Sequence, residues 1–247
     1  MTAIMRSTLW LSFFATILLA WWMMFGMARM SGLDVLGRPV GMNMMPMTSF
    51  GTLFPMWGIM MVAMMLPTMI PTLRAYEDLI VSANGSRVGW AGVIAGYTVT
   101  WFVFAAVIAS VQVALISARI VDGLGIASSG WIAGGLLILV GFFQFTKLKE
   151  VCHGVCHAPM SYFLGHWKTG FSGGFSMGLA LGSFCVGCCW GFMVLGFVGG
   201  VMSLLWMGLA TLVMVIEKLP QLGAYITKPL GVVLVIAGLG IWGLTLV

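Results

Sequence analysis

Charged side chains are scarce in this chain. Only 7% of its 247 residues are Asp, Glu, Lys or Arg, whereas soluble domains carry about 25%. Hydrophobic residues make up 61%, and the mean hydropathy is +1.11. These values exclude an ordinary soluble domain and indicate an integral membrane protein. The net charge of +5 is spread over short connections without a basic run, so we expect no nucleic-acid partner.

Motifs for nucleotide binding and for secreted disulfide frameworks are also missing. The chain has no GxxxxGK[ST] loop, so any transport is not driven by ATP bound to this chain. Five cysteines in a membrane protein do not suggest a secreted disulfide framework. The chain does contain C-x-x-x-C-H, but its extra residue counts against the attachment of a c-type haem.

Seven segments are apolar enough to cross a bilayer, for which a helix needs about 20 residues. No A-x-A cleavage site follows the first, which we therefore interpret as a retained span. We predict an all-α, polytopic membrane helix bundle of about seven transmembrane helices that forms one domain over residues 1–247. The expected spans are 9–28, 51–73, 89–116, 128–146, 171–195, 201–216 and 228–246.

The distribution of Lys and Arg predicts the orientation. With a cytoplasmic N-terminus and seven spans, the cytoplasmic segments hold eight of the eleven Lys and Arg residues, as the positive-inside rule requires. The remaining three are Arg29, Arg38 and Arg119. We therefore expect residues 29–50 outside and residues 147–170 inside.

Thiols and imidazoles concentrate in residues 144–159, QFTKLKEVCHGVCHAP. Cys152 and Cys156 are four residues apart, as are His153 and His157, so on a helix each pair shares a face. Thiolates and imidazoles suit soft and borderline transition metals. The segment is therefore a candidate metal or redox site. The alternative is a polar loop in which the cysteines have no role.

A second cysteine cluster lies inside the fifth predicted span. Cys185, Cys188 and Cys189 stand at i, i+3 and i+4, so all three thiols can face one side of a helix. Glycines in this span are spaced by four residues, as in small-xxx-small helix contacts. They are Gly174, Gly178 and Gly182, and then Gly187 and Gly191. Close helix packing alone would also explain this pattern. If the cysteines are ligands, we expect the second span to be the neighbour, with Met60 and Met64 completing a thiolate–thioether site.

Methionine is unusually abundant, at 22 residues. Its thioether selects Cu(I) among the common metals, although Met also fills irregular gaps in packed interiors. One group lies in the connection 29–50, in GMNMMPM, where Gly, Asn and Pro oppose a regular helix. An interfacial segment lying on the bilayer is the alternative there. The candidate ligands of this group are Met42, Met44, Met45 and Met47.

The second group of methionines lies in the second span. Met56, Met60 and Met64 step by four, and Met61 and Met65 add a neighbouring row, which makes one thioether face of a helix. Core packing explains such a stripe equally well. Prolines at 67 and 71 follow and predict a kink or an opening of the helix.

Acidic groups are rare, and Glu217 stands beside Lys218 at the end of the sixth span. Ionisable residues at that depth are functional candidates. The alternative is an ordinary helix end with a lysine that reaches the membrane surface.

Four stretches give the chain a family resemblance: MMVAMMLP at 60–67, FQFTKLKEVC at 143–152 with Cys156 and Pro159 after it, FCVGCCW at 184–190, and the Glu217–Lys218 pair. The chain resembles bacterial proteins described as predicted metal-binding integral membrane proteins. The resemblance implies metal binding in a bacterial inner membrane. The residues that it implies are Met60, Met61, Met64, Met65, Cys152, Cys156, Cys185, Cys188, Cys189 and Glu217.

The chain departs from the family pattern at two positions. The residues after the two cysteines of 152–156 are more often Leu and Arg, whereas here they are His153 and His157. The departure adds candidate ligands and leaves the shared metal preference open.

Copper handling is the function that these features favour. The thioethers and thiols predict a protein that binds Cu(I), with zinc as the alternative metal, and that acts as a transporter or as a chaperone loading copper into a membrane partner. A series of weak ligands lets a soft ion move by exchange. Two other functions stay open, namely a membrane thiol–disulfide oxidoreductase and an accessory subunit of a larger membrane complex.

Overall fold

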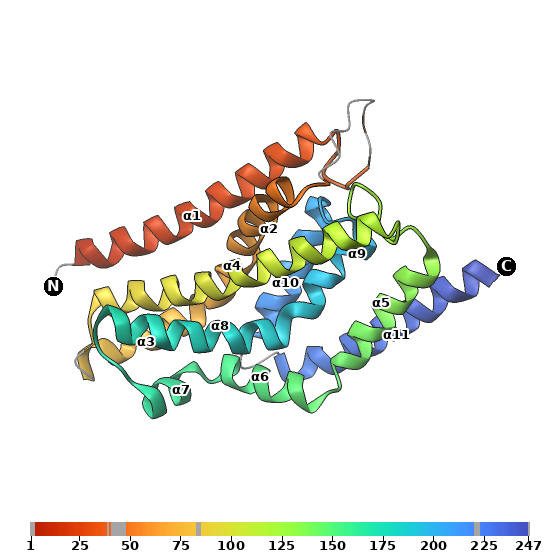
Figure 1. Cartoon of the computed structure of the whole chain (residues 1–247). Coiled ribbons are helices and arrows are strands. Elements are labelled where there is room, and N and C mark those ends of the chain that lie inside the picture. The colour runs from red at the N-terminus through yellow and green to blue at the C-terminus, as the bar shows by residue number, and fades with distance from the viewer. Residues whose placement is uncertain (1–2, 39, 41–47, 83–84, 220–222, 247) are drawn as a thin grey trace.

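A computed structural model describes residues 3–38, 40, 48–82, 85–219 and 223–246. Long helices run side by side, and the two chain ends lie at opposite ends of the molecule (Figure 1). The helices are α1 (Ala3–Met30), α2 (Phe50–Met65), η1 (Pro67–Met69, a 3-10 turn), α3 (Ile70–Ser82), α4 (Arg87–Ser117), α5 (Gly130–Phe143), α6 (Lys147–His157), α7 (Pro159–His166), α8 (Gly170–Val194), α9 (Gly196–Gly199), α10 (Leu204–Glu217) and α11 (Gly223–Leu246).

The described residues confirm a multi-pass, all-helical membrane protein. Five helical segments are long and apolar enough to cross a bilayer, and a sixth is added if α5 and α6, which meet at a bend of 64°, count as one span. The prediction of about seven transmembrane helices is therefore close to the observed number of candidate spans, but the two numbers are not equal. The predicted span at 128–146 contains α5, and the predicted span at 201–216 corresponds to α10, which ends at Glu217; each helix has 14 residues. A 14-residue helix is about 21 Å long, whereas the hydrocarbon core is about 30 Å thick.

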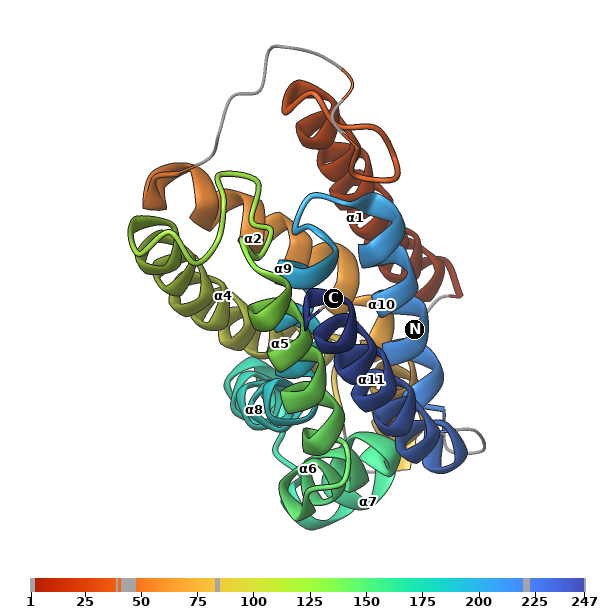
Figure 2. The same ribbon diagram turned by 90° about the vertical axis from the view of Figure 1, so that its right-hand side faces the viewer.

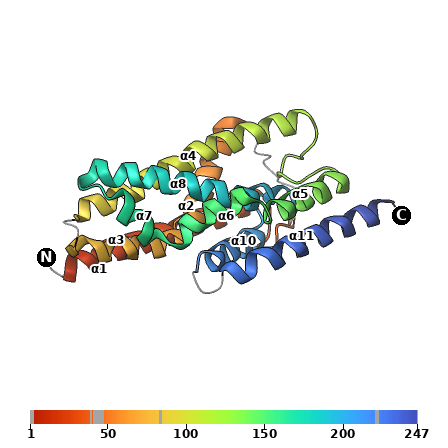
Figure 3. The same ribbon diagram turned by 90° about the horizontal axis from the view of Figure 1, so that it is seen from below.

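Glycines hold α8 against α4, and the two helices lie together in Figure 1 and Figure 3. A Cβ added at Gly174 would meet the backbone of Gly89, and one at Gly178 would meet the backbone of Val93. The Thr100 hydroxyl of α4 also donates to the Leu179 carbonyl of α8 at 3.3 Å. The expectation that these glycines bring the second span close is therefore wrong, because the third span, α4, occupies the contact.

The other two glycines of α8 face different partners. A Cβ at Gly187 would lie 2.7 Å from the Cys152 sulfur of α6, and one at Gly191 would lie 2.9 Å from the Val140 side chain of α5. The absence of side chains at these two positions lets the bent α5–α6 segment approach the cysteine-bearing part of α8.

Residues 147–157 form helix α6, so the interpretation of this stretch as a polar loop is wrong. Thr146 caps the helix, and its hydroxyl accepts a hydrogen bond from the Lys149 backbone N–H at 3.3 Å. Such a cap satisfies one of the free N–H groups at a helix start. Helix α6 packs against α8, and α7 packs against α3 and α6; α6 and α7 lie together on one side of the bundle (Figure 2).

Pro67 breaks the second span as predicted. Helix α2 ends at Met65, the 3-10 turn η1 follows, and α3 continues. Because Pro67 has no N–H, the carbonyl of Ala63 loses its helical donor, and the Trp21 indole of α1 donates to it at 3.1 Å. The Met65 carbonyl accepts from the Thr68 hydroxyl at 2.8 Å and from the Tyr97 hydroxyl at 3.4 Å. At this break the hydroxyls of Thr68 of η1 and Tyr97 of α4 lie next to one another, and the Tyr97 hydroxyl contacts Cys185 of α8.

Candidate metal centre

Three cysteine sulfurs gather inside the bundle. The Sγ atoms of Cys156, Cys185 and Cys188 all lie within 4.8 Å of one another. Cys156 and Cys188 are 3.9 Å apart, and these three residues are buried. Among the described residues this is the group of His, Cys, Asp and Glu side chains whose ligand atoms converge closely enough to hold a metal ion. It joins α6 to α8, two helices that are distant in the sequence.

The remaining cysteines border this group. Cys189 Sγ lies 3.3 Å from Cys188 Sγ and 4.0 Å from Cys185 Sγ, so the three cysteines of α8 share one face as their spacing predicts. Cys152 faces Gly187 and does not belong to the converging group. All five cysteines are free thiols.

The two histidines of α6 turn toward α10. His153 Nε2 lies 2.8 Å from the backbone carbonyl oxygen of Glu217, and His157 Nε2 contacts the same oxygen. The two rings lie in contact, with centroids 4.0 Å apart and their planes tilted by 43°. The structure thus places both imidazoles at the end of α10, and the converging group of sulfurs includes neither.

A buried ion pair lies beside the cysteines. Lys149 Nζ of α6 is 2.9 Å from Glu217 Oε2 of α10, and the two side chains are 1% and 2% exposed. The ammonium also donates to the Cys188 carbonyl at 2.9 Å. The other carboxylate oxygen, Oε1, has no hydrogen-bond partner among the described atoms. The ion pair with Glu217 therefore links α6 to α10, and the hydrogen bond from Lys149 to Cys188 links α6 to α8.

A second buried cation touches a sulfur directly. Lys218 Nζ is 2.9 Å from Cys185 Sγ and 2.9 Å from the Thr68 hydroxyl, and it lies 5.9 Å from the centre of the Tyr97 ring. The Tyr97 hydroxyl is itself 3.0 Å from Cys185 Sγ. The thiolate is the form of cysteine that binds metals, and here a positive charge and a hydroxyl face that sulfur.

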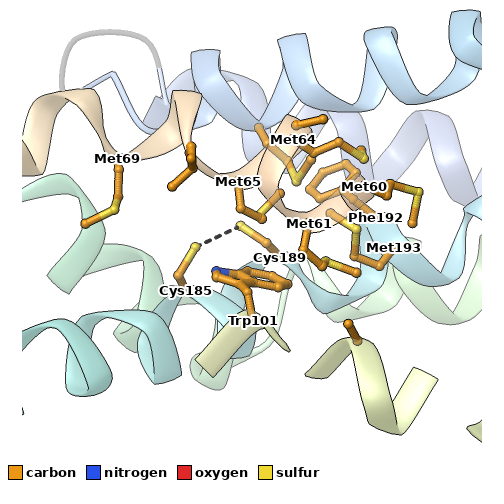
Figure 4. Packing of buried hydrophobic residues seen from close by; sticks show 14 of the residues in the cluster. Met60, Met61, Met64, Met65, Met69, Trp101, Cys185, Cys189, Phe192 and Met193 are labelled. Carbon is orange, nitrogen blue, oxygen red and sulfur yellow. Dashed lines mark hydrogen bonds between the residues drawn. The ribbon is translucent and has the colours of Figure 1, made fainter. Parts of the chain in front are cut away.

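The methionines of α2 lie on the neighbouring side of the cysteines. Figure 4 shows Met60, Met61, Met64 and Met65 together with Cys185 and Cys189. All four methionines are buried, at 3% exposure or less. The predicted thioether face is thus directed into the protein. Met42, Met44, Met45 and Met47 lie outside the described residues.

Sequence reasoning did not place Lys149, Tyr97 or Thr68 in this centre, and it singled out Lys218 only as the neighbour of Glu217. One signal was present for the first of them. Lys149 precedes Cys152 by three residues and Cys156 by seven, so on a helix it shares their stripe. Thr68 and Tyr97 carry no comparable signal, because their place beside Cys185 depends on how η1 and α4 pack.

A comparison with protein-family models decides the family. A model described as PpoB2, copper chaperone, matches residues 54–241. The chain belongs to the PpoB2 copper chaperone family. The matched range contains the whole cysteine centre and the buried lysines around it. Searches of curated proteins and of solved structures give no match.

Membership of the PpoB2 family confirms the prediction of membrane copper handling. The resemblance seen in the sequence implied metal binding without naming the metal, and the description of the family names copper. The converging thiols fit that metal, since soft sulfur ligands select copper(I) over harder cations.

Proposed function

We propose that this copper chaperone carries Cu(I) on the sulfurs of Cys156, Cys185 and Cys188. The supporting observation is the convergence of these three buried sulfurs within 4.8 Å of one another. Thiolates are soft ligands and suit Cu(I). In this proposal Cys189 and the thioethers Met61 and Met65 surround the ion, while Cys152, His153 and His157 pack around the site without binding it.

The buried charges support a site for a thiolate-bound cation. Lys149 and Glu217 neutralise one another, which leaves the ammonium of Lys218 facing Cys185. Three thiolates and one Cu(I) carry a net charge of −2, and Lys218 offsets part of it. An unpaired charge in a low-dielectric interior is costly, so this lysine favours the loaded anionic centre.

The ligand set favours copper over zinc. Structural zinc sites are almost always tetrahedral with four Cys or His ligands. The converging group holds three sulfurs, and the imidazoles of α6 are engaged with the Glu217 carbonyl. Four-coordinate zinc would need Cys189, whose Sγ borders the group at 3.3 Å from Cys188 Sγ, to join the three converging sulfurs.

The site is also suited to handing copper on. One of its three sulfurs comes from α6, which is joined to α5 through a bend of 64°, so a small shift of α6 would separate Cys156 from α8. In this proposal the recipient is another membrane protein or complex, the membrane is the bacterial inner membrane, and the N-terminus is cytoplasmic. The orientation rests on the distribution of Lys and Arg.

Metal analysis of the purified protein tests the proposed function. The chain is expressed in copper-supplemented cells and purified in detergent without added chelator, and copper and zinc are measured by mass spectrometry. We expect near-stoichiometric copper in the unaltered protein and a large loss in Cys156→Ser. The matched control is Cys152→Ser, on the same helix, which keeps its copper. Equal copper in both variants, or zinc in place of copper, would contradict the proposal.

A further inference from the structure

A second group of sulfurs lies in the same bundle. Four methionines line one small cavity of about 10 Å³, namely Met60 and Met64 of α2, Met193 of α8 and Met207 of α10. Each is 3% exposed or less. The other lining residues are Phe192, Gly196, Val201, Trp206 and Ala210. Figure 4 shows the first three of these methionines clustered next to the cysteines.

This convergence differs from the stripe that the sequence predicts. Met60 and Met64 share a helix face by spacing alone, but Met193 and Met207 come from two other helices. A cavity of about 10 Å³ accommodates roughly one water-sized sphere, and its lining carries thioethers as the ligand groups. Thioethers are soft ligands that select Cu(I).

We propose that Met60, Met64, Met193 and Met207 form a second Cu(I) site, which delivers copper to the cysteine centre. The inference rests on the proposed function, because it needs that centre as the acceptor. Neutral thioethers do not offset the charge of the ion, whereas the thiolates do. The methionine site is therefore the weaker of the two, and copper passes from it to the cysteines.

A neighbouring cavity supplies the approach to this site. It is lined by Met56 and Met202 and shares Val201 with the methionine cavity. Its other lining residues lie at the end of the bundle that carries the α1–α2 and α4–α5 connections: Ser31, Leu53, Gln112, Gly123 and Leu124. Methionines thus line both cavities, which share Val201 as a lining residue. In this proposal the ion moves from the outer cavity to the inner one by exchange between weak sites.

Cu(I) titration of the full-length protein in detergent tests the proposal. Bathocuproine disulfonate serves as the competing chelator and indicator. We expect the protein to bind two equivalents of Cu(I), one tightly and one weakly. The variant Met60→Leu/Met193→Leu/Met207→Leu should lose the weak equivalent, with an affinity at least tenfold lower, and keep the tight one. Met→Leu substitutions conserve volume well, and retention of the tight equivalent reports a folded protein.

The matched control replaces two buried methionines outside the cavity, as Met24→Leu/Met177→Leu, and keeps both equivalents. A second readout is X-ray absorption at the copper edge in selenomethionine-labelled protein. We expect Cu–Se scattering from the second equivalent and its loss in the triple leucine variant. Unchanged affinity in that variant, or absence of Cu–Se scattering in the parent, overturns the proposal.

The outcome for the cysteine centre is separate. Cys156→Ser/Cys188→Ser should lose the tight equivalent and keep the weak one with its Cu–Se scattering. If that variant keeps both equivalents, the cysteine centre is refuted while the methionine site stands.

Discussion

The buried pair of Lys149 and Glu217 yields the sharpest prediction about stability. Their charged atoms are 2.9 Å apart, and the side chains are 1% and 2% exposed. The change Glu217→Leu removes the carboxylate and leaves the ammonium with the Cys188 carbonyl at 2.9 Å and the Phe192 ring at 5.2 Å. Neither of these groups carries a negative charge that could neutralise it.

The expected cost follows from that uncompensated charge. Removing one partner of a buried ion pair typically destabilises a protein by about 3–5 kcal/mol, whereas replacing both partners by apolar residues is often neutral or stabilising. We therefore expect Glu217→Leu and Lys149→Met each to lower the free energy of unfolding by about 3–5 kcal/mol. The double variant should be more stable than either single variant.

The assay is unfolding of the purified protein in mixed micelles with rising SDS, followed by circular dichroism. A control uses the peripheral contact between Arg6 and Glu77, at 3.3 Å with Arg6 64% exposed. Arg6→Met should change the free energy of unfolding by at most about 1 kcal/mol. If the double variant loses as much stability as the two single variants added together, Lys149 and Glu217 do not act as a pair.

Three further predictions concern the contacts around the centre. Gly178→Leu should prevent assembly of the folded bundle, since a side chain there meets the α4 backbone; normal yield of monodisperse protein in gel filtration would refute this. Trp21→Phe should cost about 1–3 kcal/mol by leaving the Ala63 carbonyl without its donor, and an unchanged SDS midpoint would contradict it. Lys218→Met should weaken Cu(I) binding by about 10–100-fold because it removes the charge beside Cys185; equal affinity in competition titrations would exclude that role.

Local periodicity explains what was predictable about the centre. Cys185, Cys188 and Cys189 share a face because positions i, i+3 and i+4 stack on any α-helix. Pro67 breaks the second span because it lacks an N–H. Both features depend only on residues within one or two turns, so the sequence was sufficient for them.

Tertiary packing explains what was not predictable. The sequence presented Cys152 and Cys156 as equivalent partners, but the bend after α5 and the approach at Gly187 direct only Cys156 to the sulfurs of α8. Glycine spacing likewise reveals a close helix contact without naming the neighbour. A clue to α4 did exist, since Gly92 and Gly96 carry the same spacing of four.

The number of membrane spans was overestimated for a related reason. The segments 128–146 and 201–216 are apolar enough for a span, but the corresponding helices, α5 and α10, have only 14 residues each. Composition does not reveal where such a helix stops, because the stop depends on the bend before α6 and on the buried Glu217 and Lys218 at the end of α10.

X-ray absorption at the copper edge, on protein loaded with one equivalent of Cu(I), tests the central claim most directly. A centre built on Cys156, Cys185 and Cys188 predicts a first shell of three sulfurs, which falls by one in Cys156→Ser and is unchanged in Cys152→Ser. A first shell dominated by nitrogen or oxygen, or a sulfur count that Cys156→Ser does not alter, would contradict the assignment of copper to these three cysteines.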